Sequence, residues 1–334
     1  MNNNPFTSST FEHIWIDHYC KRKKVVSIDG IKDVKFTKSK FFPIYVNLGK
    51  NFTNGMTYSI SESISNFKNK VAIIYDVPNF FTVDYDEKSS IKLNKVRQYE
   101  AYYGNIGSIK SKDDILSTFF NSSKSKYNFK RNLRQFDETI PGNSYKVYFG
   151  HIDKSDYDRE IKIFKELLSK RFDKISMFNT VLPMWDFYEE LIYPLILEKK
   201  VVLSVVYNSN QPIALSINFL NDRMLTVSIR TFDIDYFKLN IGNIEIYKLI
   251  EWCIDNNIEI FDLSKGEGDY KMRWTTTEYF YDHHIIYDSK SITAVILGKL
   301  LIGHFQIKQY LRDQKINILY VKLKHIMKKL LFQK

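Results

Sequence analysis

The stretch from Phe261 to Trp274, FDLSKGEGDYKMRW, brings reactive side chains together behind a short apolar segment. A strand is expected over Ile258–Leu263, and a polar loop with two glycines follows at Ser264–Asp269. In α/β proteins a strand end often fixes the backbone while the next loop presents reactive groups. An ordinary strand-to-helix connection has the same composition, so the stretch predicts a site but leaves its chemistry open.

The same residues resemble the D-x-x-x-G-x-x-x-Y-K-x-x-[FW] segment of the CelD-like acyltransferases. That family is a branch of the GNAT superfamily linked to bacterial polysaccharide and envelope biosynthesis. The matching positions in this sequence are Asp262, Gly266, Tyr270, Lys271 and Trp274.

Three further stretches are similar to the same family and occur in the same order. They are the basic segment at Ser125–Phe136, the helix end at Leu168–Lys174, and the helix and strand at Gly242–Leu263. Together they cover roughly residues 120–288. The resemblance implies an α/β (α+β) fold with mixed GNAT-like sheets flanked by helices, and an acyl-CoA such as acetyl-CoA as donor.

Acyl transfer needs a deprotonated acceptor, a stabilised oxyanion and a protonated leaving group. Asp262 or Glu267 could be the base, and Lys271 could neutralise an oxyanion or a phosphate. Tyr270 could protonate a leaving thiolate, which is the role the resemblance implies, and Arg273 could bind an anion. The ordinary alternatives are a turn cap for Asp262, a solvated lysine, a core tyrosine and a surface ion pair for Arg273.

The donor loop departs from the family pattern. GNAT enzymes hold the coenzyme A pyrophosphate on a [QR]-x-x-G-x-[GA] loop at a helix N-terminus, where backbone N–H groups face the anion. The equivalent segment, LNIGNI at Leu239–Ile244, contains only Gly242. Asn240 and Asn243 are candidate caps and Lys238 lies nearby, so these four residues are the predicted donor-binding set, with a plain helix cap as the alternative.

Arginines supply the candidate substrate contacts. Arg131 and Arg134 are three residues apart on one face of an expected helix. They could clamp the phosphates of a nucleotide-sugar, a lipid-linked glycan or a tRNA end, or form a solvated basic face. Arg230 ends an expected strand across from the donor helix and is predicted to line a cleft.

Composition sets the outer bounds. The 334 residues are 44% apolar and 16% aromatic, which supports a sizeable core. The two cysteines cannot form a disulfide framework. His283 and His284 are neighbours on an expected strand, so their side chains point to opposite faces and no metal site is expected. The N-terminal residues lack the pattern of a secretory signal, and a cytoplasmic protein, with peripheral membrane contact, is predicted.

Periodicity predicts two α/β units and a tail. Residues 1–120 are predicted to be a degenerate GNAT-like unit, 121–290 the acyltransferase domain and 291–334 the tail. Helices are expected at Thr10–Cys20, Lys92–Gly104, from an N-cap at Ser155, and at Gly242–Asn256; strands are expected at Lys40–Gly49, Val71–Val77, Tyr279–Asp288 and three times between 201 and 232.

The charge of the chain is concentrated at its C-terminal end. The whole sequence carries a net charge of +11, and residues 299–334 contain nine Lys or Arg and one acid, which gives +8. Apolar residues recur there at spacings of three and four, which is typical of a basic amphipathic helix. Such a helix suits an anionic membrane surface or an acidic partner, with packing on its own domain as the alternative; DNA binding is not expected.

Three functions fit these observations. The first is a GNAT acyltransferase that modifies an amine or hydroxyl of a sugar or cell-envelope precursor. The second is a Fem-type aminoacyl transferase that uses aminoacyl-tRNA, because that group also lacks the donor loop. The third is a non-catalytic membrane-associated binding protein that has kept the fold.

Overall fold

The computed structural model describes residues 3–21, 23–61, 67–85, 90–175, 179–266, 268–314 and 316. Its contacts divide the chain into two compact units, each built from two separate stretches. Unit 1 contains residues 1–22 and 100–279, and unit 2 contains residues 23–99 and 280–334. The predicted boundaries at 120 and 290 treat the units as consecutive, whereas here the chain passes from one unit to the other within two strands, β6 (Ile91–Asn105) and β12 (Thr277–Asp288).

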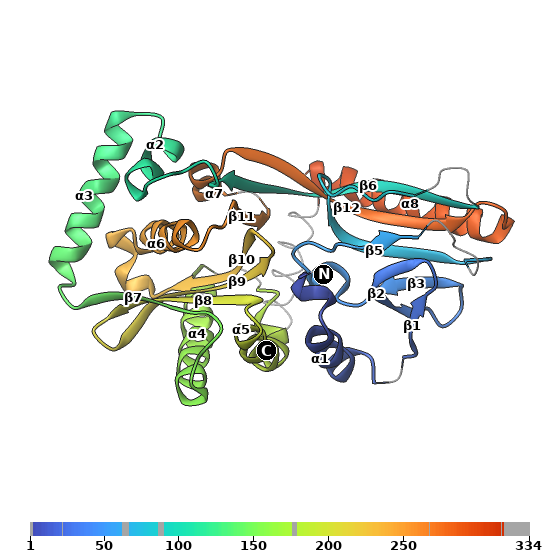
Figure 1. Ribbon diagram of the computed structural model, residues 1–334, viewed down its shortest axis with the longest axis horizontal. Helices are drawn as coiled ribbons and strands as arrows, with labels where there is room; N and C mark the ends of the chain where they lie inside the picture. Colours follow the sequence, from blue (N-terminus) through green and yellow to red (C-terminus); the bar gives the residue numbers. More distant parts are fainter. Residues whose placement is uncertain are drawn as a thin grey trace, which may run out of the picture. The chain divides into compact units, whose positions relative to one another are not determined.

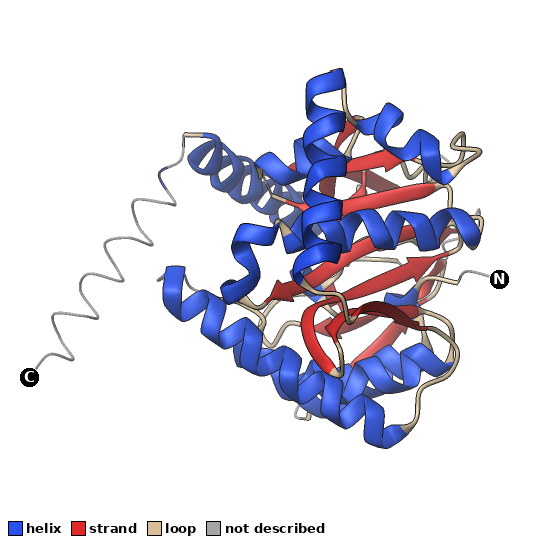
Figure 2. Cartoon of the chain, turned by 90° about the vertical axis from the view of Figure 1, so that its left-hand side faces the viewer, coloured by secondary structure: helices blue, strands red, loops and turns tan. Residues whose placement is uncertain are grey.

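Unit 1 is a mixed sheet with helices on both faces. Its strands are ordered β6-β11-β10-β9-β8-β7, with α6 on one face of β8–β10 and α4 and α5 on the other (Figures 1 and 2). Its elements are α1 (Ser9–Tyr19), α2 (Ile115–Phe119), α3 (Ser123–Thr139), β7 (Asn143–Tyr148), α4 (Lys154–Ile175), α5 (Trp185–Leu197), β8 (Val201–Asn208), β9 (Gln211–Asn221), β10 (Met224–Phe232), α6 (Ile241–Asp255), β11 (Ile260–Lys265) and α7 (Asp269–Trp274).

Unit 2 is a second mixed sheet. Its strands follow the order β1-β2-β3-β5-β12, and β4 pairs with β2. The β3–β5 pair is parallel and the β5–β12 pair is antiparallel. Its elements are β1 (Val25–Ile28), β2 (Ile31–Lys38), β3 (Ile44–Asn47), β4 (Ser59–Ile60), β5 (Val71–Pro78) and α8 (Ile292–Asp313). The predicted α/β fold of mixed sheets with flanking helices is confirmed.

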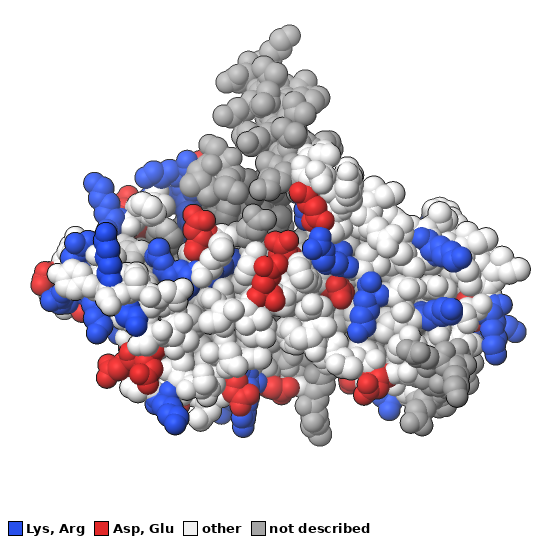
Figure 3. All heavy atoms as spheres, turned by 90° about the horizontal axis from the view of Figure 1, so that it is seen from above, with Lys and Arg blue, Asp and Glu red and all other residues white. Residues whose placement is uncertain are grey.

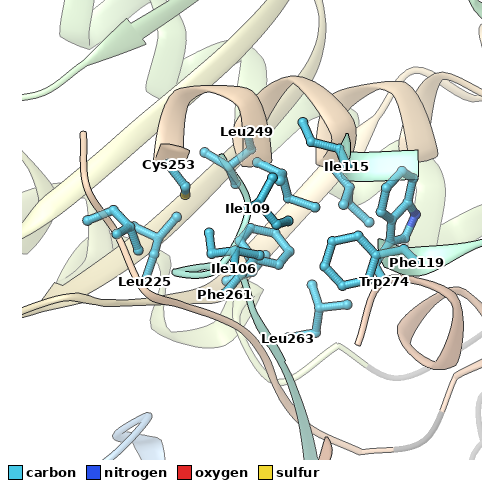
Figure 4. Packing of buried hydrophobic residues seen from close by; sticks show 14 of the residues in the cluster. Ile106, Ile109, Ile115, Phe119, Leu225, Leu249, Cys253, Phe261, Leu263 and Trp274 are labelled. Carbon is cyan, nitrogen blue, oxygen red and sulfur yellow. The ribbon is translucent and has the colours of Figure 1, made fainter. Parts of the chain in front are cut away.

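Apolar periodicity explains the helices of unit 1. In α4 the side chains of Tyr157, Ile161, Phe164 and Leu168 recur at spacings of three and four, and all four are buried. The predicted N-cap Ser155 is wrong, because α4 already begins at Lys154. In α6 the apolar side chains face a cluster around Phe261 and Trp274, with Leu249 and Cys253 above Phe261 (Figure 4).

The predicted helix at Lys92–Gly104 is wrong, because this segment forms the long strand β6. Ala101 and Gly104 are buried three residues apart, and that spacing imitates a helix. Around Val96 the burial alternates residue by residue, as in a strand. The deciding interactions are with β11, which pairs with β6 antiparallel from a position far along the sequence.

Gly104 of β6 lies against the ring of Phe119 and the backbone of Trp274, so a larger side chain there should be destabilising. A Cβ atom there would lie 2.8 Å from Phe119 Cε1 and 3.1 Å from the backbone oxygen of Trp274. We expect Gly104→Ala to lower the free energy of unfolding by about 1–3 kcal/mol, as overpacked cores do. Gly303→Ala is the control, because its Cβ would meet nothing within 4 Å and a helix interior favours Ala. Urea denaturation measures both variants; equal stability of Gly104→Ala and wild type would contradict the packing.

Candidate active site

The site lies where two parallel strands stop pairing. Strand β10 pairs with β11 only from Met224 to Thr226, which is opposite Asp262. Just beyond, the pairing of β10 with β9 shifts register between Val227 and Ile229. Such an irregularity bends a strand and re-aims its side chains. Ligands of open α/β sheets often bind beyond the carboxyl ends of parallel strands that diverge in this way.

A pocket of about 400 Å³ opens at this point, at the N-terminus of α6. Its wall includes Ser228 and Arg230 from β10, and Asn240, Gly242 and Asn243 from the start of α6. The N-cap Asn240 has a left-handed backbone, with φ of 59°, and its side chain does not cap the helix. The first turn of a fifteen-residue helix therefore lines the pocket, with its partial positive charge directed there.

Arg230 is held in the pocket wall by a buried carboxylate. Its guanidinium donates to Glu245 at 2.9 Å and to the backbone oxygen of Gly242. Glu245 is 1% exposed and also accepts hydrogen bonds from the hydroxyls of Ser204 at 3.0 Å and Ser216 at 2.6 Å. These three donors satisfy a carboxyl group that would be costly to bury without hydrogen-bond partners. Glu245 is thus a positioning residue for Arg230, and its place among apolar residues of α6 gave no sign of this in the sequence.

Arg171, on α4, is the second arginine of the pocket and was not among the predicted site residues. Its guanidinium lies 4.5 Å from the ring centroid of Phe232 and donates to the backbone oxygen of Arg230 at 3.4 Å. Burial lowers the pKa of Arg171, and the charge of Arg230 lowers it further. Within the described part of the chain no Asp or Glu forms an ion pair with Arg171. Because Glu245 offsets only one of the two arginines, the pocket is left with a net positive charge.

Aromatic side chains complete the pocket. Tyr270 lines it, and the Arg230 guanidinium lies 5.1 Å from the centre of the tyrosine ring. Phe232 and Phe237 also line it, and their rings are stacked with centroids 6.4 Å apart. Phe237 is 70% exposed, and an exposed aromatic ring at the edge of a pocket marks a surface suited to a flat ligand group.

Five predicted site residues meet in this pocket: Arg230, Asn240, Gly242, Asn243 and Tyr270. The structure does not bring the others there. Lys238 is exposed outside its lining, Arg131 and Arg134 are exposed on α3, and Arg273 is exposed on α7. Glu267 lies outside the described residues.

Lys271 is buried under the loop rather than projecting from it. It is 5% exposed, and its Nζ donates to the backbone oxygens of Ser264 at 3.0 Å and Lys265 at 2.5 Å. Burial lowers the pKa of Lys271 to about 8, while the charge of Asp262 opposes the shift and that of Arg230 adds to it. Lys271 is therefore not the solvated lysine that was the ordinary alternative. Its side chain ties the start of α7, which carries Tyr270 into the pocket, to the end of β11.

Asp262 is fully buried, at the last position where β11 pairs with β10. It accepts hydrogen bonds from the Ser264 N–H at 2.9 Å and from the Tyr279 hydroxyl at 3.0 Å. Burial raises the pKa of Asp262 to about 6, although these hydrogen bonds act in the opposite direction. Asp262 does not line the pocket, so the geometry gives it a part in holding the turn after β11.

The pocket lies in a segment that matches a known protein family. Residues 123–272 match a family described as an acetyltransferase (GNAT) domain. This segment has the GNAT fold. It contains the pocket, both arginines and the loop clamped by Lys271.

Two solved structures resemble the chain over most of its length. FemX is 9% identical with a TM-score of 0.53, covering 84% of this chain and 90% of its own. A conserved protein of unknown function from Bacteroides thetaiotaomicron VPI-5482 is 10% identical with a TM-score of 0.51, covering 86% of this chain and 92% of its own. At such identities the likeness concerns the fold alone. A search of curated proteins gives no match to this sequence.

Two negative observations concern only the residues that the structure describes. Among them, no group of three or more His, Cys, Asp or Glu side chains is arranged to hold a metal ion. Within the same residues, no helix is both long and apolar enough to cross a membrane.

The clamp by Lys271 generates a stability prediction. We expect Lys271→Ala to lower the free energy of unfolding by about 1–3 kcal/mol, because two backbone oxygens, one in a buried residue, lose their donor. Arg273→Ala, on the same helix but exposed, should stay within about 0.5 kcal/mol of wild type. Denaturant unfolding measures both. A fully stable Lys271→Ala protein would show that the clamp does not hold the loop.

The raised pKa of Asp262 generates a pH prediction. Between its ordinary value of 3.8 and about 6, the native state keeps a proton that the unfolded state has lost. Stability contributed by this group is therefore present at low pH and is lost as the pH rises through about 6. Relative to Asp262→Asn, wild type should lose stability across this window and change little above it. Urea denaturation at a series of pH values tests this, and a difference that does not vary with pH would refute it.

Proposed function

We propose that this protein is an acyltransferase that moves an acyl group, such as acetyl, from an acyl-CoA to an amine or hydroxyl of a sugar or cell-envelope precursor. The observation that carries the proposal is the positively charged pocket at the N-terminus of α6. It lies within the segment that has the GNAT fold, next to the point where β10 and β11 diverge.

The donor assignment is supported by the charges of the pocket. A coenzyme A thioester carries phosphates, and the pocket offers them Arg171, Arg230 and the N-terminal turn of α6. The arginines supply the positive charge that the incomplete donor loop, with its single Gly242, does not supply through backbone groups alone. The stacked rings of Phe232 and Phe237 provide a face for a flat nucleobase.

The proposed reaction transfers the acyl group from the thioester sulfur to a nitrogen or oxygen of the acceptor. The acceptor nitrogen or oxygen attacks the thioester carbonyl carbon, a C–N or C–O bond forms, and the carbonyl oxygen becomes an oxyanion. The C–S bond then breaks, and the thiolate takes a proton that the Tyr270 hydroxyl is positioned to supply. The acceptor gives its own proton to solvent, which also restores the proton of Tyr270.

The acceptor assignment rests on different support, the resemblance of Asp262–Trp274 to the CelD-like acyltransferases. In this proposal Arg131 and Arg134 bind phosphates of a nucleotide-sugar or lipid-linked glycan from the exposed face of α3. Metal ions take no part, and the protein acts in the cytoplasm.

A Fem-type transferase that uses aminoacyl-tRNA is the second candidate. One observation favours it: the start of α6 has a single left-handed residue, the N-cap Asn240, and a single glycine, Gly242 in the first turn, where a multi-glycine cradle would follow a pyrophosphate. A basic face on α3 also suits a nucleic-acid backbone. A binding protein without activity is the third candidate.

Calorimetry with acetyl-CoA tests the donor assignment. Arg171→Ala should weaken binding by about tenfold or more, because a hydrogen bond to a charged group contributes about 1.5–3 kcal/mol. Arg223→Ala is the matched control, because Arg223 lies just before the other end of β10 and pairs with Glu259 at the surface. Its affinity should equal that of wild type.

The same titration separates the candidates. Binding of acetyl-CoA that depends on Arg171 supports the first function. Binding of a charged tRNA, with no response to acetyl-CoA, would replace it with the second, and the absence of both would favour the third. Acetyl-CoA binding that is indifferent to Arg171→Ala would remove the arginine from the donor site.

A further inference from the structure

Helix α8 of unit 2 is apolar on two opposite sides. Its inner side packs on the strands of its own unit, where Ala294 and Phe305 are buried with Ile73 and Ile285. Gly298 is held so closely that a Cβ atom would lie 2.6 Å from the ring of Tyr287. These contacts hold the inner side of α8 on the sheet of unit 2.

The outer side carries an exposed apolar stripe. Its members share one side because they are spaced by four, four, seven and three residues. They are Ile292, Ile296, Leu300, Ile307 and Tyr310, and each is between 53% and 79% exposed. In Figure 3 uncharged surface is broad at the upper right, on the side where α8 lies in Figure 1. Apolar side chains that form a continuous exposed row on a helix usually mark a surface that another molecule covers.

The charges around the stripe identify the kind of partner. Lys299 lies beside the stripe, and the span from Ile292 to Tyr310 contains no Asp or Glu. Lys308, the other lysine of this span, lies on the side of Phe305 that packs on unit 2, where the charge of Asp76 acts on it. Arg312 and Asp313 come next, and Asp313 pairs with Arg97. The sequence of 315–334, almost wholly outside the described residues, adds six lysines and no acid. An apolar stripe with basic neighbours matches a surface that is apolar within and negative at its rim.

We propose that the outer face of α8 docks on the surface of a membrane that contains anionic lipids. The side chains of Ile296, Leu300 and Ile307 enter the boundary between headgroups and acyl chains. Lys299 stays at the level of the lipid phosphates, and Tyr310 sits at the interface with its hydroxyl in the polar layer.

Two other occupants fit the charges less well. A second copy packed through the same stripe would cover its apolar side chains but bring no acid to Lys299, because the span from Ile292 to Tyr310 contains none. Residues 317–334 carry five lysines and no acid, so they offer no opposite charge either. An anionic lipid surface supplies both apolar cover and opposite charge. The helix lies on the surface rather than crossing it, since no described helix is suited to span a bilayer.

Co-sedimentation of the full-length protein with vesicles tests the proposal. Vesicles of mixed phosphatidylserine and phosphatidylcholine should bind wild type at low ionic strength, and vesicles of phosphatidylcholine alone should bind far less. Leu300→Glu should reduce the partition coefficient by about tenfold or more, because it removes an apolar contact and adds repulsion. Leu197→Glu, which makes the same change at an exposed site at the end of α5, should bind as wild type does.

The possible results either support or overturn the docking of α8 on a membrane. Loss of binding in Leu300→Glu alone, with an unchanged circular dichroism spectrum, supports the docking surface. Equal binding of both variants would leave only diffuse charge attraction and overturn it, as would no binding of wild type to anionic vesicles. A dimer of wild type that dissociates in Leu300→Glu, seen by sedimentation velocity without vesicles, would assign the stripe to a second copy instead.

Discussion

The candidate site depends on a limit to strand pairing. Strands β10 and β11 stay parallel only as far as Thr226 and Asp262. Immediately beyond that pair both strands deform: β10 shifts register, and β11 reaches Ser264, whose φ is 59°. A non-glycine residue in this conformation is held by its surroundings. The separation gives α6 and α7 room to bring a helix end and a tyrosine to one pocket.

Polar contacts in low-dielectric surroundings maintain that separation. Glu245 orients Arg230 from within the core, and Lys271 ties α7 to the end of β11 through two backbone oxygens. Leaving a buried polar group of these contacts without its partner would be costly, so each contact favours one arrangement of the site. The indole N–H of Trp274 adds another contact, donating to the side-chain oxygen of Asn243 at 2.8 Å. The end of α7 and the start of α6 are thereby tied to each other.

Sequence reasoning recovered the elements whose signal is local. The strand, helix and strand around the donor region could be predicted because apolar periodicity and turn residues mark them. Arg171 and Glu245 could not be assigned to the site, because their partners come from other elements. The motif identifies Lys271, but its burial against β11 could not be predicted, since a sequence pattern does not show which way a side chain points. Strand β6 was misread because its pairing partner is remote in sequence.

The division of unit 1 into residues 1–22 and 100–279 has a consequence for synthesis on the ribosome. Helix α1 packs on α5, where Trp15 lies edge-on to Phe187 and His18 meets Glu190. The contact between His18 and Glu190 spans 172 residues of sequence. The nascent helix must therefore wait, with Phe11 and Trp15 uncovered, until α5 has left the ribosome. An early chain of this kind is suited to capture by chaperones, and contacts this distant in sequence favour slow folding.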